Sequence, residues 1–460
     1  MTLAKIISKL FVLNYIKNTV ACLSTSVGNA VPNFDNPRQA FKSKSTADLI
    51  RACSILALCS QDILVDNALK LMRAGEAILG LKIFKAVMQK TFYGQFVAGE
   101  TGPAVIRTAE NLRKQDLTLM VAPALESDVG EKSNYDLQDR NLNEYLKLAE
   151  LTAQGNFGGM EKPACLQMKM TAVVPTELLI NLSKIILEIN EAQKLKIIEK
   201  FSNLMMGVKS DTIVPGLRDE LQVELIKASE RLMKIGLKTK EVGVRLLVDM
   251  EWTYVNPACS AFASALMKIF NSESPAVCST IQCYLKGAME TIIWERKVAE
   301  YFQVCYGAKL VRGAYLEKEL QVAPDLVCQS YEDTCNNYER VMTQALEIAT
   351  KAAAEKHFII VATHNEETVK IATRLLQKLQ ASDHVNVAFA QIYGMAENIS
   401  LPLAQANYLV YKSVAFGSLH QVIPYLARRA AENRAIMKGA RRERELMSNE
   451  IKRRILERST

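Results

Sequence analysis

Residues 408–433 read YLVYKSVAFGSLHQVIPYLARRAAEN, a pattern that predicts one strand followed by one helix. The near-continuous apolar run that ends at Ser413 is typical of a strand buried on both faces. Gly417 provides a turn, and Ser418 is placed to cap the helix that follows. A strand that passes through a glycine turn into a helix is the repeating unit of parallel α/β folds.

Seven further apolar, β-branched runs precede this unit and alternate with longer helical patterns. Eight strands with intervening helices over about 320 residues suit a (βα)8 TIM barrel, and spacing alone leaves a doubly wound sheet as the alternative. The stretch from 175 to 243 is too long for one barrel helix, so we expect two or three helices there. The runs lie at 117–122, 166–173, 244–250, 280–284, 308–313, 358–363, 386–392 and 408–414.

The segments before and after the predicted barrel differ from it in their pattern of apolar and charged residues. Residues 35–115 carry apolar residues at spacings of three and four and predict an N-terminal helical arm. Residues 116–440 predict the barrel, and residues 441–460 predict a basic C-terminal helix. Residues 1–34 contain no acid and carry lysines among apolar and hydroxyl side chains. This composition predicts a mitochondrial targeting segment, with a frayed helical N-terminus as the alternative.

The net charge of +8 is unevenly spread, because basic residues concentrate from Arg428 to the C-terminus. Acids interleaved at helical spacing favour a solvated helix laced with ion pairs, with contact to a membrane surface as the alternative. We expect no nucleic-acid partner. The 10 cysteines form no CxxC and no regular pairing, which favours reduced thiols over disulfides or a metal site.

Polar side chains recur where the predicted strands end, which is where a barrel places its chemistry. Each has a structural explanation on its own: Asp249 as a helix cap, His364 as a hydrogen-bonded buried histidine. Their joint placement at successive strand ends favours a common site. The residues concerned are Lys169, Asp249, Glu251, Gln282, Lys309, Arg312, Thr363, His364, Asn365, Gln391, Tyr393 and Ser413.

Arg428 and Arg429 lie side by side, and two adjacent guanidiniums repel each other unless an anion sits between them. Their planar forks match a carboxylate. With Lys169, Lys309 and Arg312 they predict a cationic cavity whose main counter-charge is Asp249. No GxGxxG follows a strand and no P-loop motif is present, so a redox cofactor would have to lie across the barrel mouth.

Six motifs, in order along the chain, resemble the proline dehydrogenase family, and the resemblance runs from about Thr91 to Arg454. It implies a distorted FAD-binding (βα)8 barrel in mitochondria. It also implies oxidation of a cyclic amino acid at the carbon next to nitrogen, with electrons passed to a membrane quinone. The motifs are LVDME at 247–251, IQCYLK at 281–286, KLVRGAY at 309–315, ATHN at 362–365, QIYGM at 391–395 and YLARRAAEN at 425–433.

The resemblance also implies roles for single residues. Arg428, Arg429 and Lys169 would hold the substrate carboxylate, and Asp249 would lie beside substrate and flavin, with Lys309 near the reacting flavin. The remaining substrate-pocket residues would be Tyr315, Ile392, Tyr425 and Ser413. The flavin would contact Gln282, Lys309, Val311, Gly313, Ala314, Thr363, His364, Asn365, Gln391 and Glu432.

Three positions depart from the family pattern. Lys309 stands where bacterial members have an Arg, and a lysine is a point donor without the fork. Met250 replaces a frequent Ala. Ser413 stands where proline-oxidising members carry a Tyr, which opens a space the size of a phenol and adds a hydroxyl donor and acceptor. A ring with a 4-hydroxyl would fit there, and the segments at 119–124, 412–419 and 438–443 also resemble the hydroxyproline dehydrogenase branch.

We therefore expect a dehydrogenase that converts trans-4-hydroxy-L-proline to 1-pyrroline-3-hydroxy-5-carboxylate. One alternative is an L-proline dehydrogenase that forms 1-pyrroline-5-carboxylate. The other is a barrel that has lost catalysis and serves as a mitochondrial binding protein. The predicted partners are a small cyclic amino acid, a quinone and a peripheral contact with the inner membrane.

Overall fold

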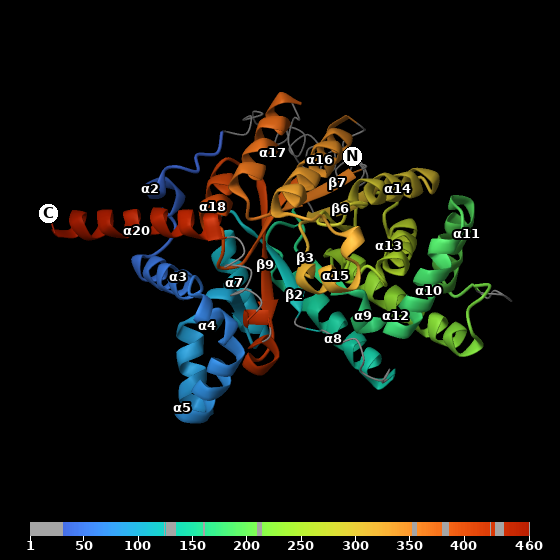
Figure 1. Cartoon of the computed structure of the whole chain (residues 1–460), viewed down its shortest axis with the longest axis horizontal. Helices are drawn as coiled ribbons and strands as arrows, with labels where there is room; N and C mark the ends of the chain where they lie inside the picture. Colours follow the sequence, from blue (N-terminus) through green and yellow to red (C-terminus); the bar gives the residue numbers. More distant parts are fainter. Residues whose placement is uncertain are drawn as a thin grey trace, which may run out of the picture.

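Eight parallel strands close into a barrel surrounded by helices (Figure 1). The computed structural model describes residues 31–123, 125, 135–159, 162–208, 214–351, 357–379, 386–423, 425–427 and 437–459. Strands β2 to β8 are neighbours in chain order, and β9 pairs with both β8 and β2. This closure rules out the doubly wound alternative and confirms the (βα)8 prediction. The strands are β2 Thr118–Pro123, β3 Cys165–Lys169, β4 Arg245–Asp249, β5 Val277–Gln282, β6 Tyr306–Val311, β7 His357–Ala362, β8 Val387–Ile392 and β9 Leu409–Phe416.

Each predicted run overlaps a strand, but several bounds differ: β5 covers 277–282 rather than 280–284, and β6 covers 306–311 rather than 308–313. The second run ends at Lys169, because residues 170–173 turn into the short helix α9. A three-residue strand, β1 (Val97–Gly99), pairs with β9 outside the barrel, with a register shift between its two ends. A strand of three residues is too short to show a periodic pattern in sequence.

Helices follow the strands. Between β3 and β4 the chain forms the short α9 and then, within the stretch at 175–243, the three helices α10, α11 and α12, in agreement with the expected two or three. The barrel helices are α8 Tyr135–Gln154, α9 Met170–Val173, α10 Thr176–Glu188, α11 Glu191–Met205, α12 Asp219–Glu241, α13 Asn256–Phe270, α14 Ala288–Tyr301, α15 Leu316–Val322, η1 Pro324–Leu326, α16 Tyr331–Lys351, α17 Glu366–Lys378 and α18 Glu397–Gln405.

Apolar side chains fill the lower half of the barrel interior, where the strands begin. Alternate strand residues point inward, and the inward residues near the strand starts form one buried cluster that includes Leu247, Ile360 and Tyr411. The Arg245 guanidinium lies 3.6 Å over the Phe358 ring at this end. Every cysteine in the described part of the chain is a free thiol, as expected. The polar side chains that point inward therefore lie at the upper end of the barrel, where the strands finish.

The N-terminal arm packs beside the upper end of the barrel. Its helices are α2 Pro37–Ala40, α3 Thr46–Leu58, α4 Asp62–Asp66, α5 Ala68–Lys90, α6 Phe92–Phe96 and α7 Gly102–Arg113. The Tyr93 hydroxyl donates to the Gly417 carbonyl at 2.9 Å, just beyond β9. The Gln95 amide donates to the Gly394 carbonyl at 2.8 Å, just beyond β8. The arm is therefore tied to the turns that follow the last two strands.

The basic C-terminal helix, α20 (Met437–Ser459), is packed rather than solvated all round. Leu446 and Met447 are buried, and α20 lies against α3 (Figure 1). The Arg454 guanidinium donates to the Phe41 carbonyl at 2.8 Å. Glu450 pairs with both Arg453 and Arg454, which are the ion pairs that the interleaved charges predicted.

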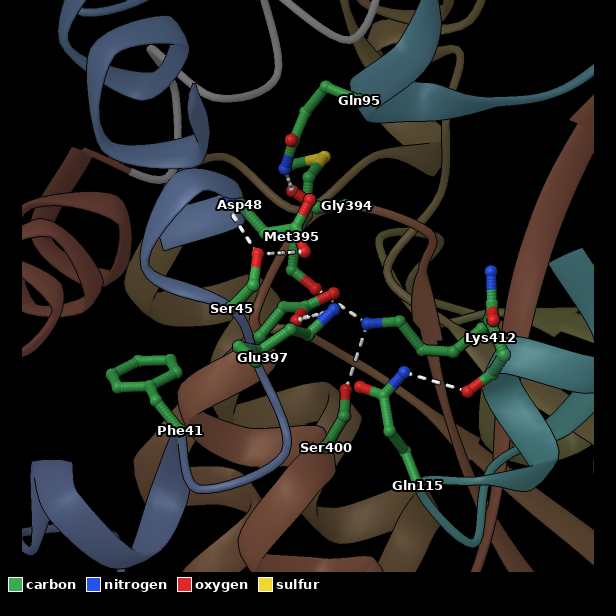
Figure 2. Close-up of polar contacts among 12 residues, drawn as sticks. Phe41, Ser45, Asp48, Gln95, Gln115, Gly394, Met395, Glu397, Ser400 and Lys412 are labelled. Carbon is green, nitrogen blue, oxygen red and sulfur yellow. Dashed lines mark hydrogen bonds and ion pairs between the residues drawn. The ribbon is translucent and has the colours of Figure 1, made fainter. Parts of the chain in front are cut away.

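A buried charge cluster joins β9 to these outer segments. Lys412, the neighbour of Ser413, points outward from the barrel and is fully buried. Its Nζ donates to the Met395 carbonyl at 2.7 Å and to the Ser400 hydroxyl at 2.9 Å (Figure 2). Burial lowers the pKa of Lys412 to about 8, although Glu397 and Glu443 oppose this shift.

Glu443 and Glu397 complete the cluster. The Glu443 carboxylate accepts from the backbone N–H groups of Ala396 and Glu397 at 3.0 and 2.7 Å, so α20 caps the start of α18. Glu397 pairs with Lys44 of the arm at 2.5 Å. Burial raises the pKa of Glu443 to about 7. The arm, β9, α18 and α20 thus meet at one set of buried charges.

The raised pKa of Glu443 predicts a pH-dependent stability. Its pKa rises from 4.5 to about 7 on folding, so the folded chain binds more protons in that window and the contribution of Glu443 to the free energy of unfolding falls as pH rises. The Glu443→Gln variant resembles the protonated carboxyl. We expect it to gain stability relative to the wild type between about pH 5 and about pH 7.5 in urea denaturation.

Glu445→Gln is the matched control, since Glu445 is exposed on the same helix. It should keep a constant difference from the wild type over this range. A Glu443→Gln curve that runs parallel to the wild type would contradict the assignment.

Candidate active site

The upper end of the barrel is organised around one buried cation. Lys309 on β6 is 5% exposed, and its side chain points into the barrel. Its Nζ pairs with Asp249 Oδ1, at the end of β4, at 2.5 Å and donates to Gln167 Oε1, on β3, at 2.7 Å. A buried ammonium needs such acceptors, because an unpaired charge in the interior is strongly unfavourable.

Gln167 extends this network to Ser413. Its Nε2 donates to the Ser413 hydroxyl oxygen at 2.8 Å. The orientation of the amide is fixed, because an ammonium only donates and Gln167 must therefore present its oxygen to Lys309. The Ser413 oxygen then accepts from Gln167, and the Ser413 proton remains to be donated to another acceptor.

Strand register explains why these four side chains meet. Lys169 pairs with Asp249 in the β3–β4 register, and Gln167 lies two residues earlier on the same face of β3. Ser413 lies opposite Met120 of β2 and Ile392 of β8. Gln167 was missed in the sequence analysis, although its spacing of two from Lys169 was a usable signal for a shared face.

Lys169 ends β3 beside the buried carboxylate of Glu251. Its backbone N–H donates to the hydroxyl of the buried Tyr145 at 3.1 Å. Glu251 accepts from the Thr171 N–H at 3.1 Å and from the Thr171 hydroxyl. Burial raises the pKa of Glu251, while the nearby Lys169 charge opposes that shift. The loops after β3 and β4 are thereby held together.

The Gln282 side chain forms its hydrogen bonds with other groups of the protein. It ends β5, and its Nε2 donates to the Met250 and Glu251 carbonyls at 3.1 and 3.0 Å. Its Oε1 accepts from the Asn256 amide at 2.7 Å. Two of these bonds reach the backbone just after β4 and the third reaches Asn256 at the start of α13, so Gln282 holds the segment that follows Asp249.

Gly313, which follows β6 after Val311, is needed at a close approach. Its φ is +127°, and an added Cβ would lie 1.6 Å from the Tyr284 ring. Only glycine combines that conformation with that contact. The backbone of 311–314, including Ala314, is therefore held against a buried aromatic ring at the mouth.

The short helix α15 and the loop after β4 contact each other beyond the strand ends. The Tyr315 ring lies 4.4 Å from the Trp252 ring. Glu319 is buried and accepts from the Thr253 N–H and hydroxyl, both at 2.8 Å. These contacts join the segments that follow β4 and β6, two strands separated in the sheet by β5.

The residues after β7 and β8 mostly bind other protein groups. Asn365 caps α17 by accepting from the Thr368 N–H at 3.0 Å. His364 Nε2 accepts from the Ile392 N–H at 3.0 Å, so its ring is oriented toward β8. Gln391 accepts from the Ser400 hydroxyl at 2.8 Å and donates to the Thr363 carbonyl at 3.3 Å.

The prediction that Arg312 contributes to the cationic cavity is wrong. Its guanidinium lies 4.5 Å over the Tyr338 ring, donates to the Thr368 hydroxyl at 3.0 Å and donates to the Thr363 hydroxyl. Arg312 follows the last residue of β6, and its contacts with Tyr338 of α16 and Thr368 of α17 turn it away from the barrel interior.

Two predicted pocket residues lie toward the arm. Ile392 and Tyr425 pack against the cluster that contains Met88, Met395 and Leu426. Arg428, Arg429 and Glu432 lie outside the described residues, as do residues 1–30 of the predicted targeting segment. The predicted carboxylate clamp therefore stays a prediction.

Two buried hydroxyls at this end are available to a bound group. Among the described residues, no partner is present for Thr280 Oγ1 or the Tyr284 hydroxyl. Thr280 lies opposite Lys309 in the β5–β6 register, and Tyr284 lies against Gly313. Buried polar atoms are rarely left unsatisfied, so this pair fits a polar cofactor across the mouth.

The Lys309 network predicts a measurable contribution of Gln167 to stability. Gln167→Met preserves volume but removes one acceptor of a buried ammonium. We expect it to lower the free energy of unfolding by about 1–3 kcal/mol, as measured by urea denaturation. Gln154→Met, at an exposed site on α8, is the control and should change stability by less than about 0.5 kcal/mol. Equal losses in the two variants would show that Gln167 has no such role.

Comparison with known proteins gives the same assignment as the motifs. The family model for proline dehydrogenase matches residues 105–442. Hydroxyproline dehydrogenase of Bos taurus is 37% identical, with 91% of this chain and 92% of that protein covered. Hydroxyproline dehydrogenase of Homo sapiens is 35% identical, with 91% and 92% covered. Proline dehydrogenase 1, mitochondrial, of Homo sapiens is 27% identical, with 94% and 91% covered.

The fold likeness extends to solved structures. Proline utilization A from Bdellovibrio bacteriovorus superposes with a TM-score of 0.59 at 20% identity, over 86% of this chain. The match covers 37% of that longer protein. The family model spans most of the chain, and the relatives named above match it nearly end to end. The chain therefore belongs to the proline dehydrogenase family.

Proposed function

We propose that this protein is a mitochondrial, FAD-dependent dehydrogenase that oxidises trans-4-hydroxy-L-proline to 1-pyrroline-3-hydroxy-5-carboxylate and passes the electrons to a quinone. The observation that carries the proposal is the Ser413 hydroxyl, which points into the barrel and is held by Gln167 at 2.8 Å. Relatives named hydroxyproline dehydrogenase are also more similar to the chain than those named proline dehydrogenase 1.

FAD would bind across the mouth of the barrel. The polar contacts of the cofactor would come from Lys309, from the backbone around Gly313, and from the unpartnered Thr280 and Tyr284 hydroxyls. The predicted contacts also include Gln282, Val311, Ala314, Thr363, His364, Asn365, Gln391 and Glu432. FAD, when bound, supplies the two-electron oxidation of the carbon–nitrogen bond, and the protein supplies binding and orientation.

The substrate is held by charge and shape. The carboxylate would bind Arg428, Arg429 and Lys169, with a charge-assisted pair contributing on the order of 1.5–3 kcal/mol. Asp249 and Lys309 form the ion pair at the floor of the site, where Asp249 positions the ring amine. The amine must lose its proton, since only the free lone pair assists oxidation at the neighbouring carbon. Tyr315, Ile392 and Tyr425 would contact the ring.

Ser413 would select the hydroxylated ring. A cavity alone discriminates one hydroxyl by roughly 10²-fold, and a dedicated hydrogen bond discriminates more strongly. Because Gln167 occupies one acceptor position of Ser413, the serine proton is directed elsewhere and can be donated to a 4-hydroxyl oxygen.

L-proline oxidation is the second candidate, favoured by the 27% identity to proline dehydrogenase 1. A catalytically inactive binding protein is the third. Bound-flavin absorbance in the purified protein would exclude most of the third. Dye reduction measured side by side with L-proline and trans-4-hydroxy-L-proline separates the first two, and faster turnover of L-proline would overturn the proposal. A quinone acceptor would require a peripheral contact with the inner membrane.

Ser413→Tyr tests the selector. The phenol would fill the space proposed for the 4-hydroxyl, so we expect the ratio of kcat/KM for hydroxyproline over proline to fall by roughly 10²-fold or more. Ser413→Ala keeps the space and removes only the hydroxyl, so it should give an intermediate ratio. If both variants keep the wild-type ratio, the selector lies elsewhere.

Arg428→Met tests the carboxylate clamp. Loss of a charge-assisted pair of 1.5–3 kcal/mol predicts a rise in KM of roughly 10- to 150-fold. Arg441→Met removes an exposed cation further along the chain and should leave KM unchanged. A wild-type KM in the Arg428→Met variant would remove Arg428 from the clamp.

A further inference from the structure

Helix α5 is a helical hairpin that projects from the arm. Gly80, with φ +69°, breaks the helix into two halves. An added Cβ on Gly75 would lie 3.3 Å from the Phe84 ring, so the halves pack against each other around this turn. Figure 1 shows α5 extending beyond the barrel, beside α4. We call residues 68–90 the α5 hairpin.

One face of the α5 hairpin is anchored and the other is exposed and apolar. Met72, Phe84 and Met88 are buried in a cluster with Leu419 and Val422. The tip of the hairpin is exposed instead: Ile78 is 82% exposed and Leu81 is 52% exposed. The exposed aliphatic residues are Leu69, Leu71, Ile78, Leu79, Leu81, Ile83 and Val87. Large exposed apolar patches on a soluble protein usually mark an interaction site.

The charges of the hairpin have one dominant sign. Residues 68–90 contain five cations and one acid, a net charge of +4. The acid, Glu76, lies 3.7 Å from His420, and one cation, Lys85, pairs with Glu100 at 2.6 Å. Lys70, Arg73 and Lys82 are exposed. Exposed aliphatic groups among exposed cations are the composition of segments that lie at anionic lipid surfaces.

We propose that the α5 hairpin docks this protein on an anionic lipid bilayer, with Ile78 and Leu81 inserted at the headgroup level and Lys70, Arg73 and Lys82 on the lipid phosphates. A projecting tip suits insertion between lipids better than a flat interface with a second copy. Among the described residues, no helix is long and apolar enough to cross a bilayer, so the proposed contact lies at the surface.

The α5 hairpin is anchored on the segment that follows β9. Its buried face packs on Leu419, Val422 and Leu426, which lead along the chain toward Arg428. Helix α20, the basic segment that the sequence analysis considered for membrane contact, uses Leu446 and Met447 for packing inside the protein.

The inference rests on the membrane contact proposed above, and cosedimentation of the full chain with vesicles tests it. The vesicles are phosphatidylcholine alone and an equimolar mixture of phosphatidylcholine and phosphatidylglycerol. We expect the wild type to bind the anionic vesicles, and the Ile78→Asp/Leu81→Asp variant to bind at least roughly tenfold more weakly. Each of Lys70→Gln, Arg73→Gln and Lys82→Gln should weaken binding about fivefold on anionic vesicles only.

The matched control is Leu187→Asp/Ile293→Asp, two exposed aliphatic residues on barrel helices α10 and α14. This variant should bind vesicles as the wild type does. Wild-type binding by the tip variant, or equal loss in the control, would overturn the inference while leaving the membrane contact standing. No binding by the wild type would overturn both. A dimer in light scattering that the tip substitutions dissolve, without vesicle binding, would identify the hairpin as an interface between copies.

Vesicle binding requires neither substrate nor turnover, so its outcome is independent of the proposed reaction. Dye reduction by the tip variant with a soluble acceptor should equal that of the wild type, which checks that the substitutions leave the barrel intact.

Discussion

A buried ammonium must be surrounded by acceptors, and this requirement at Lys309 organises the upper end of the barrel. Asp249 supplies the counter-charge and Gln167 a second acceptor. The two partners come from β4 and β3, and Gln167 passes the constraint to Ser413 on β9. Three polar contacts thus join four strands. The Gln167 amide accepts from Lys309 and also orients Ser413, the residue proposed to select the substrate.

Strand β9 connects the site to the outside of the fold. Ser413 faces the barrel interior and Lys412, its neighbour, faces outward into the buried cluster with Glu397 and Glu443. Alternation along one strand therefore places the proposed selector and the anchor of the arm and α20 on opposite faces. The arm and α20 meet behind the site, where their contacts help hold the position of β9.

The arm has one buried and one exposed apolar surface. Its buried residues, such as Phe84 and Met88, pack against the segment that follows β9. Its exposed tip, around Ile78, carries the apolar surface and positive charge suited to lipid. A dehydrogenase that delivers electrons to a membrane-dissolved acceptor would benefit from such a tip, because a surface-held enzyme encounters that acceptor in two dimensions.

The sequence by itself determined the eight strands, the presence of two or three helices in the long connection and the family, because apolar periodicity and ordered motifs are local properties of the chain. It also identified Asp249, Lys309 and Ser413 as strand-end residues. Tertiary structure alone decided which side chains face one another. It turned Arg312 outward onto Tyr338, placed Asn365 on its own helix start and brought the overlooked Gln167 between Lys309 and Ser413. The reason is that the direction of a strand side chain depends on register and barrel closure, which join residues far apart in sequence.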